Sequence, residues 1–407
     1  MTITLTIERL GRQGDGVAPG PDGPVYVARA LPGEVVEGTV VEGRVDAPRI
    51  VTPSPDRVAP PCPHFRRCGG CAVQHASDDV VAAWKRGVVA DALAREGLAA
   101  EVAGPDTSPP QSRRRAALSG RKTKKGAIVG FHVRGSDEVV AIPSCRVLDP
   151  AILAALPALE AVTRLAAPRG AEVGLHVTVT ATGLDLAVIG GRALDRETMA
   201  ALVPLSSAFA RVTWDGEPAL QQVAPEVPLG SARIVPPPGA FLQATPHGEA
   251  ALVAEVTAAL AGATRVVDLF AGCGTFAFPL ARHAAVHAVE ADRAALDALA
   301  AGARRAVNLR AITTEARDLF RDPLDTAELA RFDAAVIDPP RPGARAQVER
   351  LARASLTRIA YVSCNPASFA ADAAALVSAG WRMGPVRVVD QFRWSPHIEI
   401  ATAFERP

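Results

Sequence analysis

The stretch Val266-Val267-Asp268-Leu269-Phe270-Ala271-Gly272-Cys273-Gly274-Thr275 (residues 266–275) is a short apolar strand that runs into a glycine-rich loop. Glycines directly after a strand let the backbone turn tightly and approach a ligand without a Cβ in the way. Glu290 stands at the end of the next apolar segment, where a carboxylate can accept the hydroxyls of a ribose. The stretch therefore predicts an adenosine-binding site, with a dinucleotide and S-adenosylmethionine both open as its ligand.

From about residue 241 onward, alanine-rich helical stretches alternate with short apolar strands. Such alternation is typical of a parallel sheet that is covered by helices on both faces. We therefore expect residues 241–407 to form a doubly wound, Rossmann-like α/β domain. Its strands are predicted at 265–269, 286–290, 332–337, 359–363, 387–390 and 398–404.

The remainder of the chain divides at two proline-rich stretches, near 53–63 and at Pro236-Pro237-Pro238. Residues 1–55 alternate apolar and polar positions between Gly and Pro turns, which favours a small β-barrel. Residues 56–240 are mixed α+β, with a helix expected at 78–96. The sequence thus predicts a multidomain α/β protein of three domains, since 407 residues are too many for one ordinary core.

Composition limits the class of protein. With 49% hydrophobic and 21% charged residues, the chain is expected to be globular. No apolar run is long enough to span a bilayer, and the N-terminus lacks the apolar block of a signal peptide, so a cytoplasmic protein is expected. The 44 basic residues nearly balance the 43 acidic ones, so net charge indicates no nucleic-acid partner. A local basic stretch at 113–125 either holds RNA phosphates or is a solvated face.

Two of the predicted C-terminal strands end in reactive motifs, Asp338-Pro339-Pro340-Arg341 and Ser363-Cys364-Asn365-Pro366. Ligands of open α/β sheets bind at the carboxyl ends of the strands, so both motifs should face the cleft near Gly272. A Cys thiolate can add to carbon 6 of uracil and so make carbon 5 nucleophilic enough to accept a methyl group. A base must then remove the carbon-5 proton, and Glu399 is the candidate. The structural alternatives are a buried apolar cysteine and a surface carboxylate.

Cys62, Cys68 and Cys71 have C-x5-C-x2-C spacing, and two glycines between the last two let three sulfurs converge. Cys145 is the only other cysteine outside the C-terminal domain. In a reducing compartment, such clustering indicates metal binding before disulfides. Four thiolates suit a [4Fe–4S] cluster or zinc, and unrelated structural cysteines are the remaining alternative.

Together these residues resemble the S-adenosylmethionine-dependent RNA 5-methyluridine methyltransferases, most of all the iron–sulfur branch acting on 23S ribosomal RNA. The resemblance implies that residues 1–55 are the family's TRAM domain, an OB-like RNA-binding barrel. It implies that the four cysteines hold a [4Fe–4S] cluster in the central region. It also implies Cys364 as the nucleophile and Glu399, in the H-x-E motif, as the proton acceptor. The cofactor-contacting residues that it implies are Gln243, Phe270, Thr275, Glu290, Asp318 and Asp338.

The chain departs from the family pattern at two places. The family has a proline after the D-x-F motif, whereas Arg393 and Trp394 follow Phe392 here, and Thr275 stands where relatives often have Asn. The implied function is methyl transfer from S-adenosylmethionine to carbon 5 of an RNA uridine, with ribosomal RNA favoured over tRNA. No membrane and no obligate protein partner are indicated.

Four alternative functions remain beside this one. The first is a tRNA uridine carbon-5 methyltransferase. The second is an amine-directed RNA or DNA methyltransferase, since Asp338-Pro339-Pro340 is similar to the D-P-P-Y motif, although Arg341 replaces its stacking aromatic residue. The third is a non-catalytic RNA-binding iron–sulfur protein, which leaves Cys364 and Glu399 without a role. A dinucleotide oxidoreductase comes last, because no residue pattern indicates a hydride-transfer partner.

Overall fold

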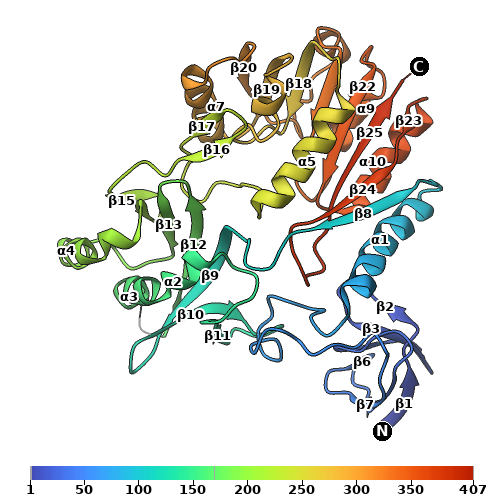
Figure 1. Ribbon diagram of the computed structural model, residues 1–407, viewed down its shortest axis with the longest axis vertical. Helices are drawn as coiled ribbons and strands as arrows, with labels where there is room; N and C mark the ends of the chain where they lie inside the picture. The colour runs from blue at the N-terminus through green and yellow to red at the C-terminus, as the bar shows by residue number, and fades with distance from the viewer. Residues whose placement is uncertain (1, 169, 407) are drawn as a thin grey trace.

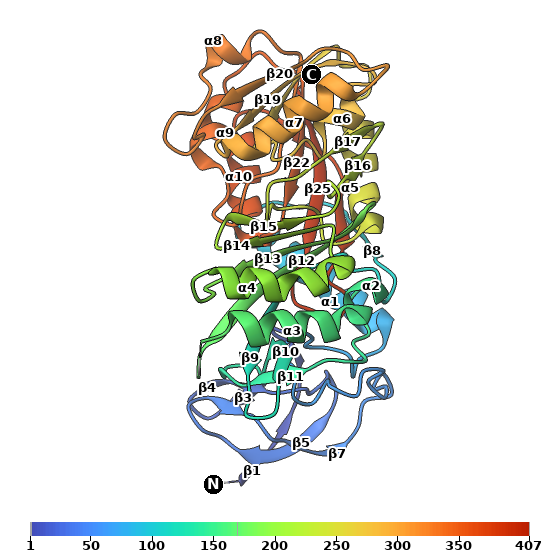
Figure 2. The same cartoon turned by 90° about the vertical axis from the view of Figure 1, so that its left-hand side faces the viewer.

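The computed structural model describes residues 2–168 and 170–406, and it shows an elongated molecule (Figures 1 and 2). The N-terminal strands lie at one end of the long axis, and a large C-terminal sheet lies at the other. A second sheet, formed by the middle of the chain, lies between them. Among the described residues, no helix combines the length and the apolar character needed to cross a membrane.

Residues 2–52 form two small sheets, β1-β5-β7 and β2-β3-β4-β6, which confirms the prediction of short strands in this range. Apolar side chains from both sheets, including the fully buried Val27 and Val36, share one core. The strands are β1 (Thr2–Thr6), β2 (Arg9–Leu10), β3 (Gly16–Gly20), β4 (Gly23–Val27), β5 (Val35–Thr39), β6 (Arg44–Val45) and β7 (Arg49–Thr52).

A turn-rich stretch, residues 53–77, follows and carries three of the cysteines; we call it the cysteine segment. It leads into α1 (Asp78–Arg95), which begins where predicted because the Ser77 hydroxyl accepts a hydrogen bond from the Val80 amide. Helix α1 packs on α10 and β8 of the C-terminal sheet.

The middle of the chain forms a seven-stranded sheet in the order β11-β10-β9-β12-β13-β14-β15, antiparallel except between β13 and β14. Helix α3 covers it, and its buried residues Leu159 and Val162 belong to the same core as Leu175 and Leu186 of the sheet. The strands are β9 (Arg115–Lys122), β10 (Ala127–His132), β11 (Val139–Ala141), β12 (Glu172–Thr180), β13 (Gly183–Ile189), β14 (Arg211–Trp214) and β15 (Glu217–Gln221). Around the sheet lie α2 (Pro150–Ala154), α3 (Leu156–Ala166), α4 (Arg196–Leu202), the 3₁₀ helix η1 (Val203–Ala208), and the hairpin of β16 (Val227–Leu229) and β17 (Ala232–Ile234).

The C-terminal sheet has the order β20-β19-β18-β21-β22-β25-β24-β8. Strands β18 to β22 are parallel, and β25 pairs antiparallel with both of its long neighbours. The strands are β18 (Arg265–Leu269), β19 (Ala285–Glu290), β20 (Ile312–Ala316), β21 (Ala334–Ile337), β22 (Arg358–Ser363), β23 (Arg382–Met383), β24 (Val386–Asp390) and β25 (Glu399–Glu405). These positions confirm the six strands predicted in this region.

Helices cover both faces of this sheet, because neighbouring residues of its buried strands point to opposite sides. Val267 and Leu269 enter a core with α1, α9 and α10, whereas Val266 enters a second core with α5, α6 and α7. The helices are α5 (Pro246–Ala259), α6 (Ala277–Leu280), α7 (Arg293–Arg305), α8 (Thr326–Leu329), α9 (Arg345–Leu351) and α10 (Pro366–Ser378).

One strand of this sheet comes from outside the predicted C-terminal range. β8 (Val102–Thr107) pairs in parallel with β24, with Val386 opposite Val102 and Asp390 opposite Thr107. The sequence of residues 102–107 does not predict a strand, because Gly104-Pro105 interrupts the segment and both residue types weaken a strand. The edge of the sheet is therefore supplied by residues 102–107 of the range predicted as the central domain.

Candidate active site

The loop after β18 is shaped by residues with positive φ, among them Phe270 (63°), Gly272 (53°) and Gly274 (97°). A Cβ on Gly274 would lie 2.8 Å from the Phe278 ring, so only glycine fits at this turn. The Gly272 amide donates a hydrogen bond of 3.0 Å to Oε2 of Glu290, at the end of β19. The structure thus brings two of the residues predicted for the adenosine site into contact, and the half-buried Thr275 lies farther along the same loop.

The neighbouring loop, residues 317–325, carries Asp318 and the exposed Phe320, whose ring lies 5.4 Å from that of Phe270. Oδ1 of Asp318 accepts a hydrogen bond from the Phe320 amide at 3.0 Å. Phe270 and Phe320 thus provide apolar surface beside the Glu290 carboxylate. Asp318, which the resemblance implies as a cofactor contact, lies in the same loop. Nothing in the sequence pattern singled out Phe320.

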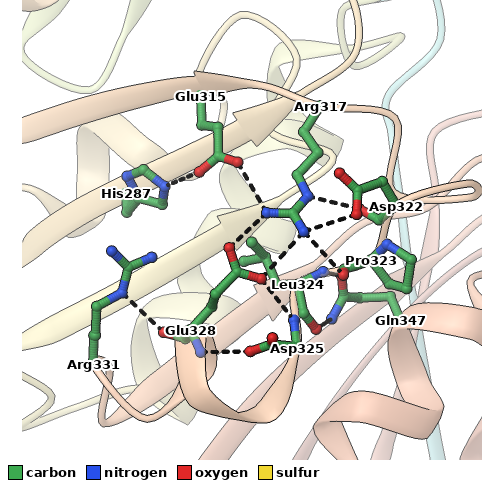
Figure 3. Close-up of polar contacts among 10 residues, drawn as sticks. All are labelled: His287, Glu315, Arg317, Asp322, Pro323, Leu324, Asp325, Glu328, Arg331 and Gln347. Atoms are coloured by element: carbon green, nitrogen blue, oxygen red, sulfur yellow. Dashed lines mark hydrogen bonds and ion pairs between the residues drawn. The ribbon is translucent and has the colours of Figure 1, made fainter.

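Arg317 holds this loop in place (Figure 3). Its guanidinium lies 3.0 Å from a carboxylate oxygen of Asp322 and 2.7 Å from one of Glu328, and it donates to the Pro323 carbonyl. It also pairs with Glu315, which His287 contacts at 3.0 Å. These hydrogen bonds raise the pKa of Arg317, the bond to Glu328 contributing most. The network therefore fixes the backbone next to Asp318.

Gln243, predicted as a cofactor contact, is buried where three parts of the chain meet. Its Oε1 accepts a hydrogen bond of 2.5 Å from Nε2 of Gln391, which follows β24. Gln391 Oε1 in turn accepts from the Ala244 amide at 2.8 Å. Arg114 donates to the Gln243 carbonyl at 3.1 Å and pairs with Glu249. The F-x-Q segment is thus tied to the C-terminal part of the chain, and Phe241 in it stays 64% exposed.

Cys364 and Glu399 lie at the same end of two paired strands. Ser363 at the end of β22 is opposite Ile400 of β25, so the residue after Ser363 and the residue before Ile400 are neighbours. Cys364 is partly exposed, whereas the Glu399 side chain is buried. The structure therefore excludes the alternative reading of Glu399 as a surface carboxylate.

The electrostatics couple these two groups to Asp338, which follows β21. Burial raises the pKa of Cys364 to about 11, the charges of Glu399 and Asp338 add to this, and Arg341 opposes it. Burial also raises the pKa of Glu399 well above its usual value, with Asp338 adding and Arg341 opposing. Burial alone raises the pKa of Asp338 to about 7. The site thus gathers acidic groups whose charged forms are disfavoured until a ligand or a cation compensates them.

Beside Cys364 lies a cavity of about 130 Å³ that is also lined by Arg341, His397 and, from the N-terminal sheets, Arg12. Arg12 donates a hydrogen bond of 2.8 Å to Oδ1 of Asn365, the residue after Cys364. Nδ2 of Asn365 donates to the Arg341 carbonyl at 2.9 Å. Sequence reasoning gave no reason to single out Arg12, because its partner is 353 positions away along the chain.

The four cysteines of the predicted metal site line one small cavity of about 20 Å³, together with apolar side chains of Phe65 and Phe131. All four are free thiols, and burial raises the pKa of Cys71 to about 12. Within residues 2–168 and 170–406, however, no group of three or more His, Cys, Asp or Glu side chains is placed to hold a single metal ion. The four cysteines therefore line one cavity, but their arrangement does not show the predicted metal site.

Only part of the basic stretch at 113–125 is free to meet a phosphate. Arg114 is buried in its ion pair with Glu249, and Arg113 lines the cysteine cavity, 5.2 Å from the Phe392 ring. Arg115 lies 4.9 Å from the Phe241 ring, and both line a pocket of about 170 Å³ together with Phe392. The three arginines thus also fix the contact between the middle and C-terminal sheets.

Comparisons with known proteins identify relatives of this chain. Residues 240–406 match the family described as tRNA (Uracil-5-)-methyltransferase. The chain is 46% identical to an uncharacterized RNA methyltransferase of Caulobacter vibrioides, over 99% of both proteins. It is 35% identical to 23S rRNA (uracil(1939)-C(5))-methyltransferase RlmD of Pseudomonas putida, over 98% of this chain and 93% of the other.

The fold is also similar to a solved structure, that of Pyrococcus abyssi tRNA (uracil-54, C5)-methyltransferase in complex with S-adenosyl-L-homocysteine. The superposition has a TM-score of 0.73 and covers 99% of this chain and 100% of the other. The two sequences are 21% identical. The chain is thus an enzyme that belongs to the family of RNA methyltransferases that includes the tRNA and rRNA (uracil-5) methyltransferases.

Proposed function

We propose that the protein transfers a methyl group from S-adenosylmethionine to carbon 5 of a uridine in RNA, and that its substrate is 23S ribosomal RNA rather than tRNA. The observation that carries the proposal is the pairing of β22 with β25, which places a partly exposed thiol beside a buried carboxyl. The choice of ribosomal RNA rests on the 35% identity to the Pseudomonas putida enzyme over almost the whole chain.

Cys364 is the proposed nucleophile. The target uridine has to leave its stacked position, since neither face of a stacked ring is accessible, and the cavity lined by Cys364 and Arg341 can receive it. The thiolate attacks carbon 6, and the electron pair of the 5,6 double bond moves toward the carbonyl at carbon 4, which makes carbon 5 nucleophilic. Arg341 favours the thiolate, because its charge lowers the pKa of Cys364.

Glu399 is the proposed base. After methylation, carbon 5 carries both a methyl group and a proton, and the carboxylate of Glu399 takes that proton. The freed electron pair restores the double bond, and the carbon–sulfur bond breaks to release the Cys364 thiolate. The raised pKa of Glu399 suits a group that has to hold a proton after the reaction.

S-adenosylmethionine, which supplies the methyl group, would lie against the loop of Gly272. Glu290 would hold its ribose hydroxyls, Phe270 its adenine face, and Asp318 and Thr275 the rim of the pocket. Gln243 would contact the cofactor, and Asp338 would position either the pyrimidine or the cofactor. The buried Gln243 amide, fixed by Gln391, supports this placement.

We further propose the domain division 1–55, 56–240 and 241–407, with the first a TRAM barrel and the last a Rossmann-like methyltransferase domain. The four cysteines are proposed as ligands of a [4Fe–4S] cluster. A cavity lined by four free thiols and closed by Phe65, Phe131 and Ile142 supports this, since cluster ligands are thiolates in apolar surroundings. An anaerobic preparation should contain iron and absorb visible light; stoichiometric zinc without iron would contradict the assignment.

The decisive test is covalent trapping. Protein and S-adenosylmethionine are mixed with 23S rRNA or tRNA that carries 5-fluorouridine, and the products are separated on a denaturing gel. Fluorine cannot leave as a cation, so a carbon-5 enzyme stalls as an adduct. An adduct with 23S rRNA that disappears in Cys364→Ala supports the proposal. If neither RNA forms an adduct although the cofactor binds, carbon-5 chemistry through Cys364 is wrong.

A further inference from the structure

The 391–398 loop, which connects β24 to Glu399, is held by residues that lie outside its own sheet. Trp394, which stands where the chain departs from the family's D-x-F-P pattern, is 6% exposed. Its side chain packs in a small core with Leu10 and Leu31 of the N-terminal region, Val73 of the cysteine segment and Trp84 of α1. Three distant parts of the chain therefore meet at this one side chain.

The backbone of Trp394 is tied to the cysteine segment as well. The amides of Ala72 and Val73 both donate to the Trp394 carbonyl, at 2.7 and 3.1 Å, and Ala72 directly follows Cys71. Trp394 has a φ of 62°, a conformation that costs a non-glycine residue free energy unless its surroundings enforce it. These two hydrogen bonds and the buried indole are the surroundings that do so.

Helix α1 supplies a second anchor. The ammonium of Lys85 is fully buried, 2.6 Å from Oδ1 of Asp390, and it donates to the carbonyls of Phe392 at 3.3 Å and His397 at 3.1 Å. Arg393 pairs with Asp78, at the start of the same helix, at 2.7 Å. Both ends of the loop are thus fixed to α1, and its middle is fixed to the cysteine segment.

We propose that Trp394 is a positioning residue for Glu399, and that its dock on the cysteine segment makes the alignment of the base depend on the state of the four-cysteine site. This inference rests on the proposed carbon-5 chemistry. Emptying the site frees the segment after Cys71, removes the partner of the Trp394 carbonyl, and loosens the loop that ends at Glu399.

The chemistry makes the proposal specific to one step. Attack by Cys364 and methylation of carbon 5 do not use Glu399, whereas removal of the carbon-5 proton does. A misplaced Glu399 therefore leaves the methylated base attached to the sulfur, so the covalent adduct should accumulate on ordinary, unfluorinated RNA. Because a misplacement of about 1 Å can cost about 100-fold in rate, the accumulation should be easily visible on a denaturing gel.

The test compares Trp394→Ala with two controls on unfluorinated RNA. Glu399→Gln should accumulate the adduct fully. Trp214→Ala, which removes another buried indole far from the loop, controls for loss of stability. We expect Trp394→Ala to accumulate the adduct while trapping 5-fluorouridine RNA nearly as fast as the wild type. If turnover and trapping fall together in Trp394→Ala, or if Trp214→Ala accumulates the adduct equally, the positioning role is wrong.

A second measurement needs no turnover and covers the case in which Trp394→Ala fails to fold. Amide hydrogen exchange of the wild type and of Trp394→Phe is followed with and without iron in the four-cysteine site. Iron removal should raise the exchange of the Ala72 and Val73 amides and of residues 391–398 in the wild type. Unchanged exchange in the loop overturns the coupling. If the wild type fails to trap 5-fluorouridine RNA, the proposed function fails instead, whatever the exchange shows.

Discussion

At the scale of single residues, the site combines groups that are costly to charge. Burial disfavours the thiolate of Cys364 and the carboxylates of Glu399 and Asp338. The charge of Asp338 raises the pKa of Cys364 and of Glu399 further, and the charge of Glu399 raises that of Cys364. The charge of Arg341 opposes this, because it lowers the pKa of both Cys364 and Glu399. The free enzyme therefore holds the proposed nucleophile, Cys364, mostly protonated. Arg341 favours the thiolate, and a bound substrate has to favour it further.

Adduct formation should accordingly rise with pH. Since the pKa of Cys364 is raised to about 11, the thiolate fraction increases by about tenfold per pH unit below that value. Arg341→Ala should slow trapping of 5-fluorouridine RNA at every pH from 6 to 9, because it removes a charge that lowers this pKa. Single-turnover trapping rates measure this, with Arg345→Ala on the exposed face of α9 as the control. A flat pH profile would contradict the protonated thiol.

Asp338 should make the free protein less stable as pH rises. Its pKa is raised from 3.8 to about 7 in the folded protein, so the folded state binds more protons than the unfolded state between these values. The free energy of unfolding thus falls as pH increases from about 4 to about 7, and above that range the buried charge of Asp338 destabilises the folded protein. Asp338→Asn should raise the melting temperature at pH 8 more than at pH 5, while it abolishes activity. An equal shift of the melting temperature at both pH values would show that Asp338 is already charged at pH 5, which would contradict the raised pKa.

The sequence pattern singled out the proposed reactive residues but not the residues that hold them. Cys364 and Glu399 could be proposed from the sequence because both lie in short motifs at the ends of predicted strands. Lys85 could not, because a single lysine in a helix is normally solvated and its partner Asp390 lies far away in the sequence. The same holds for Arg12 and Gln391, whose roles depend on contacts between distant parts of the chain.

At the scale of elements, prediction succeeded where a segment's own pattern decides its structure. β18 lies at 265–269 as predicted, because a buried apolar run ends at a glycine-rich loop. β8 and β20 were missed because both lie at the edges of the sheet, where a partner strand rather than an apolar run stabilises them. Tertiary pairing, which one sequence does not display, decides such strands.

The loop of residues 317–325 depends on a single arginine. Arg317 joins Glu315, Asp322 and Glu328, so Arg317→Ala should let the loop move and weaken S-adenosylmethionine binding. A loss of about 1.4 kcal/mol, typical of a charge-assisted hydrogen bond, corresponds to about tenfold in Kd. Calorimetry of cofactor binding measures this, with Arg353→Ala, an exposed arginine outside the loop, as the control. If both variants bind S-adenosylmethionine with equal affinity, Arg317 does not hold the cofactor loop in place.

The contact of the N-terminal strands with the catalytic motif can be tested in the same way. Arg12 follows β2 and donates to Asn365, which caps α10. Arg12→Ala should slow adduct formation several-fold, because it removes one side of the cavity beside Cys364, whereas Arg9→Ala should not. Trapping rates at saturating RNA distinguish this from weaker RNA binding. A rate that recovers fully at high RNA concentration would assign Arg12 to binding alone.

At the scale of the whole molecule, the methyltransferase part depends on the rest of the chain. α1 and β8 cover α10 and β24, although they precede the middle sheet in the sequence. A fragment of residues 241–407 should therefore expose the edge of β24 and the apolar face of α10, and aggregate. A fragment from Ser77 onward keeps both elements. Light scattering and thermal melts compare the two; a monomeric, cooperatively melting 241–407 fragment would contradict this dependence.

The pairing of β8 with β24 has a consequence for how the protein is made. β24 pairs with β25 on one side and with β8 on the other, and β25 covers residues 399–405. During synthesis, β8 leaves the ribosome early but has no strand to pair with until β24, residues 386–390, has followed. Glu399 follows nine residues after Asp390, at the start of β25. A nascent chain therefore acquires its proposed base and completes the edge of this sheet within the same 20 residues, so a chain that stops before residue 386 has neither.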